Sequence, residues 1–202
     1  MRTSKPTQQT RRHFLAAALA SAMAPMLARP AFALSQGDAE GLINKLTDEI
    51  FAVINSGKSE NRMLRDFERI FTKYADVATI ARASLGVTWR SASGSQRSAY
   101  TKAFQGYVSR KYGRQFRQFI GATVSVKKTR KTKRGFLVTT QVKFKTGSPF
   151  VVEWQVNSQR KMFDLIIEGT SMLTLERAEI GSMLDRRGGD VNKLIAHLKT
   201  AG

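Results

Sequence analysis

Residues 121–156 decide the fold of this chain, and their sequence is GATVSVKKTRKTKRGFLVTTQVKFKTGSPFVVEWQV. Apolar and polar side chains alternate through residues 136–145 and again through residues 150–156, the period of two expected of half-buried strands. Residues 123–126 predict a short strand before these two, and Thr-Gly-Ser-Pro at residues 146–149 is typical of a turn. Residues 162–168 add a fourth strand after a second turn, so the segment predicts an antiparallel meander.

Helical periodicity is found on both sides of the strands. Apolar residues recur there at spacings of three and four. We predict helices at residues 38–55, 61–74, 76–85, 172–184 and 190–198, and a long helix that Ser93-Gly94-Ser95 opens and Gly121 closes. Because helices precede and follow one block of strands, we expect an α+β fold with helices packed on one face of a curved four-stranded antiparallel sheet.

The first 33 residues have the features of a cleaved export signal. Arg11-Arg12 precedes a mostly alanine-rich apolar run at residues 14–27, and Ala31-Phe32-Ala33 provides small residues for a signal peptidase. The arginine pair favours the twin-arginine route. The alternative is an uncleaved anchor helix, but Pro25 interrupts a run that is already short for crossing a bilayer. We therefore expect residues 34–202 to be a single domain in the periplasm of a bacterium.

Basic residues dominate the charge of the chain. The formal net charge is +19, and no Asp or Glu occurs from residue 77 to residue 152. Export makes nucleic acid an unlikely partner for this charge and favours anionic membranes or acidic proteins. The alternative for the densest run is a solvated hairpin connection, and the sequence leaves both interpretations open. The candidate docking residues are Lys127, Lys128, Arg130, Lys131, Lys133 and Arg134.

Few side chains could support catalysis or bind a metal. The chain has no cysteine, and its two histidines are His13, within the signal, and His197, near the C-terminus. No nucleophile motif or metal-ligand spacing occurs, so we expect a binding or carrier protein with no metal and no enzymatic activity.

Aromatic side chains are concentrated on the long helix and on the facing strands. Phe104, Phe116 and Phe119 share the helix with three tyrosines, and Phe144 and Trp154 lie on the strands. An ordinary core is the default interpretation of such a face. A helix face opposite a curved sheet can also form the wall of a ligand cavity, and an exported basic protein works among lipids.

Two longer motifs carry a family resemblance. Leu85-Gly-Val-Thr-Trp-Arg-Ser-Ala92 and Phe163-Asp-Leu-Ile-Ile-Glu-Gly-Thr-Ser-Met172 occur in the order found in the MlaC-like, or toluene-tolerance, family of periplasmic proteins. The resemblance extends from about Ile43 to Leu198. One departure is Arg160-Lys161-Met162, where the family often has a Trp before the Asp.

The resemblance implies a soluble, monomeric carrier that binds phospholipid as cargo and needs no cofactor. Its partners would be an inner-membrane ABC transporter complex and an outer-membrane lipoprotein complex, and its role would be to maintain outer-membrane lipid asymmetry and solvent tolerance. Relatives encoded with hopanoid genes make a hopanoid-type cargo an alternative. The sequence also leaves open a periplasmic enzyme with a cone-shaped fold and a basic envelope adaptor without ligand.

Site residues follow as hypotheses from the apolar pattern and the resemblance. We expect Trp89 and Arg90 to be structural, with Arg90 paired to a buried acid such as Asp164. The predicted lipid-binding residues are Phe104, Tyr107, Val108, Tyr112, Phe116, Phe119, Phe144, Val152, Trp154, Ile166 and Met172.

Overall fold

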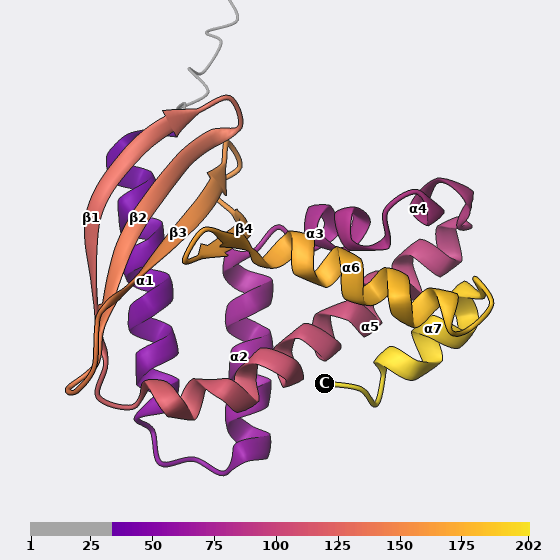
Figure 1. Ribbon diagram of the computed structural model, residues 1–202, viewed down its shortest axis with the longest axis horizontal. Coiled ribbons are helices and arrows are strands. Elements are labelled where there is room, and N and C mark those ends of the chain that lie inside the picture. The colour runs from indigo at the N-terminus through magenta and orange to yellow at the C-terminus, as the bar shows by residue number, and fades with distance from the viewer. Residues whose placement is uncertain (1–33) are drawn as a thin grey trace, which may run out of the picture. The chain divides into compact units, whose positions relative to one another are not determined.

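The computed structural model describes residues 34–202, and the predicted signal peptide lies outside the described residues. Helices and strands follow one another in the predicted order (Figure 1). The helices are α1 (Gln36–Ile54), α2 (Glu60–Tyr74), α3 (Val77–Leu85), α4 (Thr88–Ser91), α5 (Gly94–Gly113), the 3-10 helix η1 (Arg114–Phe119), α6 (Met172–Asp185) and α7 (Val191–Leu198). The strands are β1 (Thr123–Thr132), β2 (Gly135–Lys143), β3 (Phe150–Asn157), β4 (Met162–Ile167) and β5 (Thr170–Ser171).

The strands form one antiparallel meander in the order β1-β2-β3-β4-β5, so each strand pairs with its neighbour in sequence. The α+β fold is confirmed, with one correction to the strand count. The sheet has five strands rather than four because Thr170–Ser171 pairs with the end of β4. A two-residue strand is too short to show an alternating pattern in the sequence.

Strand β1 is longer than predicted and contains most of the basic run. The sequence indicated a strand ending at Val126, whereas pairing with β2 continues to Thr132. The register shifts between Val126 and Lys128, a bulge that breaks the alternation of side chains and hides the strand from a period-two pattern. The basic residues are therefore not a hairpin connection, although Lys133 and Arg134 form the turn that leads into β2.

Three helices begin at N-cap residues that can be recognised in the sequence. Ser35 and Ser93 each form a capping box, with Asp38 and Gln96 respectively, and Asp76 caps α3. These hydrogen bonds satisfy backbone N–H groups that have no partner in the first turn of a helix.

The predicted long helix is divided in two. Its α-helical part ends at Gly113, and the chain continues as the tighter η1. Helix α2 comes very close at this point, because a Cβ added to Gly113 would lie 2.7 Å from Cδ2 of Leu64. Apolar periodicity alone does not show such a close approach, so the sequence predicted one uninterrupted helix.

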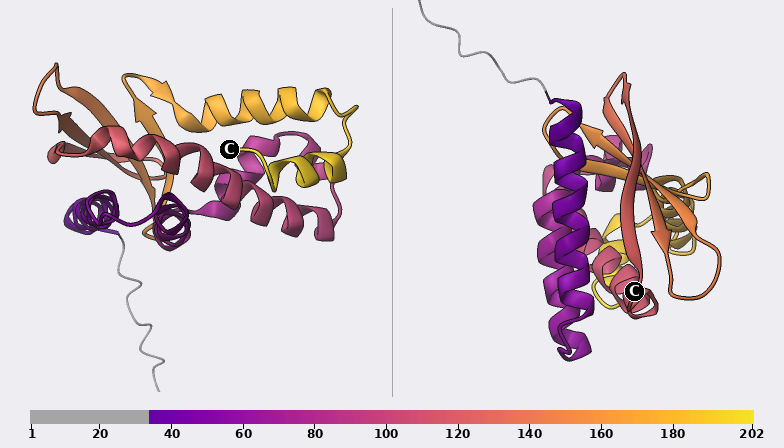
Figure 2. Two further views of the ribbon diagram at one scale, coloured as in Figure 1. Left: turned by 90° about the horizontal axis from the view of Figure 1, so that it is seen from below. Right: turned by 90° about the vertical axis from the view of Figure 1, so that its left-hand side faces the viewer.

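Helices α1 and α2 lie side by side and form a layer on one face of the sheet, as the two views in Figure 2 show. The hydrophobic core between that layer and the sheet includes Ile43, Phe67 and Val138. A second core, which includes Phe104 and Ile180, is enclosed mainly by α3, α5, α6 and α7. No helix in residues 34–202 is long and apolar enough to cross a membrane.

Asp164 connects the sheet to the start of α6. Its Oδ1 accepts hydrogen bonds from the backbone N–H groups of Leu165 and Leu173 at 2.8 and 3.0 Å, and its Oδ2 accepts one from Ser171 Oγ at 2.7 Å. Asp164 is buried, whereas Arg90 is exposed and has no bond to it. The expected pairing of Arg90 with Asp164 is therefore wrong, because backbone and hydroxyl donors occupy the carboxylate.

We predict that Asp164→Ala destabilises the domain by about 2–4 kcal/mol, since it leaves buried donors without an acceptor. Urea unfolding measures this loss. Asp164→Asn keeps one side-chain oxygen for the two N–H groups and should cost less. Asp48→Ala, which removes an exposed acid, should change the stability by about 0.5 kcal/mol or less. Equal losses for Asp164→Ala and Asp48→Ala would contradict this role.

Candidate functional site

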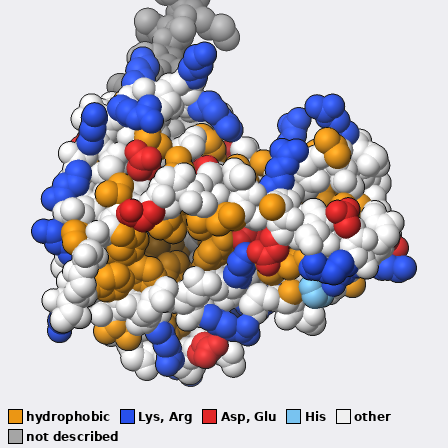
Figure 3. Space-filling model, viewed as in Figure 1, with side chains coloured by type: hydrophobic (Ala, Val, Ile, Leu, Met, Phe, Trp, Pro, Cys, Tyr) orange, Lys and Arg blue, Asp and Glu red, His pale blue; other side chains and the backbone are white. Residues whose placement is uncertain are grey.

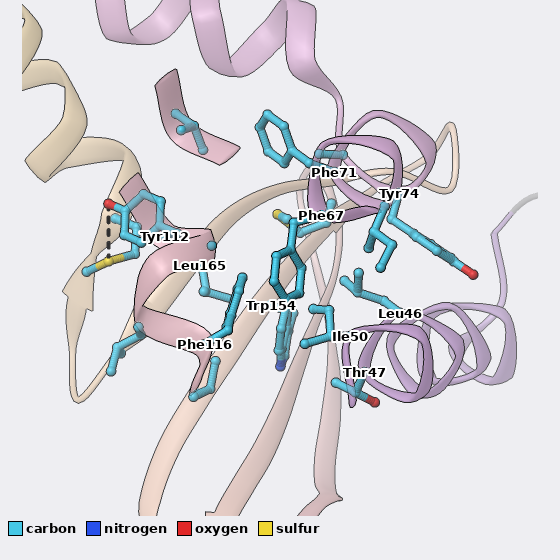
Figure 4. A pocket seen from close by; sticks show the side chains of 18 of the residues that line it. Leu46, Thr47, Ile50, Phe67, Phe71, Tyr74, Tyr112, Phe116, Trp154 and Leu165 are labelled. Atoms are coloured by element: carbon cyan, nitrogen blue, oxygen red, sulfur yellow. Dashed lines mark hydrogen bonds between the residues drawn. The ribbon is translucent and has the colours of Figure 1, made fainter. Parts of the chain in front are cut away.

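An apolar cavity of about 310 Å³ lies between the α1–α2 layer, the sheet and helix α5. Figure 3 shows it as a hollow lined by hydrophobic side chains and open on this face of the molecule. Leu46, Ile50 and Phe67 from the helical layer lie around Trp154 from β3, and Phe116 comes from η1 (Figure 4). The volume is at the lower end of the range for ligand sites.

Three polar side chains in the wall are hydrogen-bonded within the protein. Thr47 Oγ1 donates to the carbonyl of Ile43 at 2.9 Å, and Ser109 Oγ donates to that of Gln105 at 2.8 Å. Trp154 Nε1 donates to Thr140 Oγ1 at 2.9 Å. With these groups satisfied, the wall offers mostly carbon to a ligand, and such a surface favours apolar molecules.

Four phenylalanines pack together at the η1 end of the cavity, and three of them, Phe116, Phe119 and Phe150, line it. The ring of Phe119 lies 6.2 Å from Phe116, 5.6 Å from Phe144 and 6.2 Å from Phe150, measured between centroids. Phe144 and Phe150 are themselves 5.9 Å apart. These contacts join η1 to the β2–β3 connection through side chains.

A charged cluster borders the cavity between α5 and α6. Lys111 Nζ and Tyr112 Oη each donate a hydrogen bond of 2.5 Å to Glu176 Oε1. Lys111 also pairs with Glu179, to which Tyr107 Oη donates at 2.7 Å. Within the described residues, no group of three or more His, Cys, Asp or Glu side chains has the arrangement of a metal site.

The ionisation of this cluster follows from burial and pairing. Burial raises the pKa of Tyr107 and of Tyr112, which both lie beside Lys111. The hydrogen bond of Tyr107 to Glu179 and that of Tyr112 to Glu176 raise these pKa values further. Burial alone would raise the pKa of Glu179, but the bonds from Lys111 and Tyr107 outweigh it and hold that pKa below its usual value. Burial likewise opposes the charge of Lys111, yet its two carboxylate partners raise its pKa.

Most of the predicted lipid-binding residues are brought together in this wall. Their role in binding stays a prediction, but the structure fixes their position. Of the predicted residues, those that line the cavity are Phe104, Val108, Tyr112, Phe116, Phe119, Val152, Trp154 and Met172.

Tyr107, Phe144 and Ile166 do not line the cavity. Tyr107 is fully buried and its hydroxyl is directed to Glu179. Phe144 follows the end of β2 and stacks on Phe119 and Phe150. Ile166 pairs with Glu153 in the sheet, and alternation places it on the face opposite Trp154.

Sequence reasoning missed the contribution of α1 and α2. Both were predicted as amphipathic helices, but their apolar faces were not assigned to the cavity. Adjacent apolar pairs such as Ile50-Phe51 and Ile70-Phe71 widen those faces beyond a narrow core stripe, and this width is the signal that could have been used. The missed lining residues include Leu46, Ile50, Phe51, Phe67, Ile70, Phe71 and Tyr74.

The predicted docking residues lie on the edge strand β1 and on its turn, all exposed. In Figure 3, Lys and Arg side chains gather along the margin of the molecule where the sheet lies. Arg134 differs from the others, since its guanidinium lies 4.0 Å from the ring centroid of the buried Phe163.

Comparison with known proteins identifies a matching family and a similar solved structure. A sequence model described as "MlaC protein" matches residues 44–200. The fold is similar to that of the phospholipid-binding protein from Ralstonia solanacearum, whose three-dimensional structure holds a phospholipid. The TM-score is 0.69 with 20% sequence identity, and the match covers 80% of this chain and 94% of that chain.

We predict that tyrosine ionisation and alkaline unfolding occur together. All four tyrosines (Tyr74, Tyr100, Tyr107 and Tyr112) have a raised pKa, with burial as the largest cause. Above the ordinary tyrosine pKa of about 10, the unfolded chain binds fewer protons than the folded one, so stability falls as the pH rises further.

Tyrosinate absorbance and circular dichroism, followed in one alkaline titration, measure this coupling. The two signals should change together. The denatured chain is the control and should ionise near the ordinary pKa. Four tyrosines that ionise near that value in a protein that remains folded would contradict the burial described above.

Proposed function

This chain belongs to the MlaC family, and from that premise we propose that it is a lipid carrier that binds phospholipid in the cavity. The carbon wall of the cavity is the observation that supports this most directly, because apolar side chains dominate the lining and Thr47 and Trp154 use their polar groups within the protein. Such a wall suits acyl chains better than it suits bond-making chemistry. The Ralstonia solanacearum protein has a similar fold and holds a phospholipid, which supports the same proposal.

The energetics of a carrier support transport without an enzymatic step. Each buried CH₂ of an acyl chain is worth about 0.8 kcal/mol relative to water. A bilayer offers the same chain nearly the same free energy, so transfer between the cavity and a membrane is close to neutral. Direction must then come from a partner, and we propose an inner-membrane ABC transporter complex and an outer-membrane lipoprotein complex in that role.

The proposed location is the periplasm, after export by the signal at residues 1–33. The proposed physiological role is the maintenance of outer-membrane lipid asymmetry, which underlies solvent tolerance. A hopanoid-type cargo is the alternative within the same cavity, and extraction of the bound lipid distinguishes the two.

We predict that Phe116→Glu combined with Val152→Glu abolishes lipid binding. Both side chains line the cavity, and an unpaired carboxylate there opposes the burial of acyl chains. Protein purified from a bacterial envelope fraction without detergent is extracted, and its lipid is identified by mass spectrometry. Wild-type protein should carry near-stoichiometric lipid.

The matched control is Val87→Glu combined with Leu175→Glu, which adds the same two charges at exposed apolar positions. It should keep its lipid, and circular dichroism should show that both double variants are folded. Retention of lipid by the folded cavity variant would contradict the proposed wall.

We also propose that the exposed basic residues of β1 and its turn hold the carrier at anionic membranes. Each basic residue near such a surface contributes on the order of 1 kcal/mol. Reversing Lys128, Arg130 and Lys133 to Glu should therefore weaken binding to anionic vesicles by about a hundredfold or more at low salt, with a shallower salt dependence. Arg134 is left in place because it contacts Phe163.

Vesicle co-sedimentation at several salt concentrations measures the effect. Reversal of the exposed Arg82, Lys193 and Lys199 changes the net charge equally and should weaken binding much less. Equal effects of the two triple variants would mean that net charge alone acts. Unchanged binding would leave the lysines of β1 with the ordinary task of preventing edge-to-edge strand pairing.

A further inference from the structure

Glu176 is a buried carboxylate in the wall of an otherwise apolar cavity. Its exposed fraction is 3%, and it belongs to the residues that line the cavity. Both of its donors, Lys111 Nζ and Tyr112 Oη, bond to the same oxygen, Oε1. Among residues 34–202, no group donates a hydrogen bond to the other oxygen, Oε2, which is buried.

A buried acceptor without a donor is costly, and native structures usually provide one from the protein, water or a ligand. Glu176 contributes to the anchoring of α5 to α6 through Oε1, and further bonds between these helices go to Glu179, so Oε2 is not required. The second oxygen is therefore not used by the protein, and the residue that carries it lines the cavity.

The charge around Glu176 favours a donor and disfavours an anion. Lys111 faces two carboxylates, Glu176 and Glu179, so the cluster carries an excess of one negative charge when all three are ionised. A lipid phosphate placed against Oε2 would be repelled. An ammonium or a hydroxyl group would donate to it.

The position of the cluster also suits a lipid headgroup. The side chains of Lys111 and Glu179 are 23% and 39% exposed, whereas that of Glu176 is 4% exposed. The cluster thus leads from the protein surface to the cavity wall. A headgroup could reach Glu176 from the surface while its acyl chains occupy the apolar region.

We propose that Glu176 Oε2 accepts a hydrogen bond from the headgroup of the bound lipid and selects headgroups with an N–H or O–H donor. This inference rests on the proposed carrier function and adds a preference among lipids. The apolar wall cannot supply such a preference, because burial of carbon is not directional.

Three phospholipids with identical acyl chains test the inference. Phosphatidylethanolamine offers N–H donors, phosphatidylcholine has the same charge but none, and phosphatidylglycerol offers hydroxyl donors with a net negative charge. Lipid-free protein is incubated with vesicles that contain equal amounts of the three, and the lipid it takes up is identified by mass spectrometry. We expect phosphatidylethanolamine to exceed phosphatidylcholine by about tenfold, the effect of one charge-assisted hydrogen bond. The uptake of phosphatidylglycerol tells whether a hydroxyl serves as well as an ammonium.

Glu176→Gln is the decisive variant. Its amide oxygen can still accept from Lys111 and Tyr112, while an NH₂ group, a donor, replaces Oε2. The variant should lose the preference for phosphatidylethanolamine over phosphatidylcholine in the lipid that it takes up, and circular dichroism should show that it is folded. Asp185→Asn removes one negative charge from an exposed position on the same helix and should keep the preference.

Equal uptake of phosphatidylethanolamine and phosphatidylcholine by the wild type would overturn the inference and leave the carrier function intact. A Glu176→Gln variant that keeps the preference would also overturn it. If the wild type takes up none of the three phospholipids, the proposed phospholipid carrier function is rejected, and the inference with it.

Discussion

Two helices cover a sheet without filling the space between, and this unfilled apolar interface is the constraint on which the rest of the structure depends. A cavity costs about 24 cal/mol per Å³, so 310 Å³ left empty forgoes on the order of 7 kcal/mol. That figure is comparable with the whole stability of a typical domain. The second core, built by Phe104, Ile180 and their neighbours, and the bonds of Asp164 therefore hold together a protein whose other core is incomplete.

The two kinds of wall divide the tasks of a carrier. Carbon from α1, α2, η1 and the sheet excludes water from an acyl chain, and it does so for any chain of suitable size. Glu176, which is paired with Lys111, brings a charged group into the lining of the same cavity. In the proposed carrier, capacity would come from the apolar wall as a whole and selectivity from one carboxylate on α6.

The sequence predicted the elements better than the site they enclose. Period-two alternation identified β2 and β3, and cap residues such as Ser93 identified helix starts, because both signals are local. Tyr107 was misplaced because a residue's neighbours along one helix do not tell which of two cores it faces, and Ile166 because the sequence alone does not tell which face of the sheet is covered. The α1 and α2 lining was missed because a cavity is a property of several elements together, and a residue beside empty space has the same pattern as one in a filled core.

The 3-10 segment that divides the predicted long helix has a mechanical consequence. The hydrogen bonds near its end join Ile120 to Arg117 and Ala122 to Phe119, and among residues 34–202 none joins η1 to a strand. Phe116 and Phe119 hold it to the rest of the wall through ring contacts. An acyl chain that enters the cavity can replace those ring contacts with contacts to its methylene groups. Entry of a lipid therefore need not break any backbone hydrogen bond between η1 and a strand.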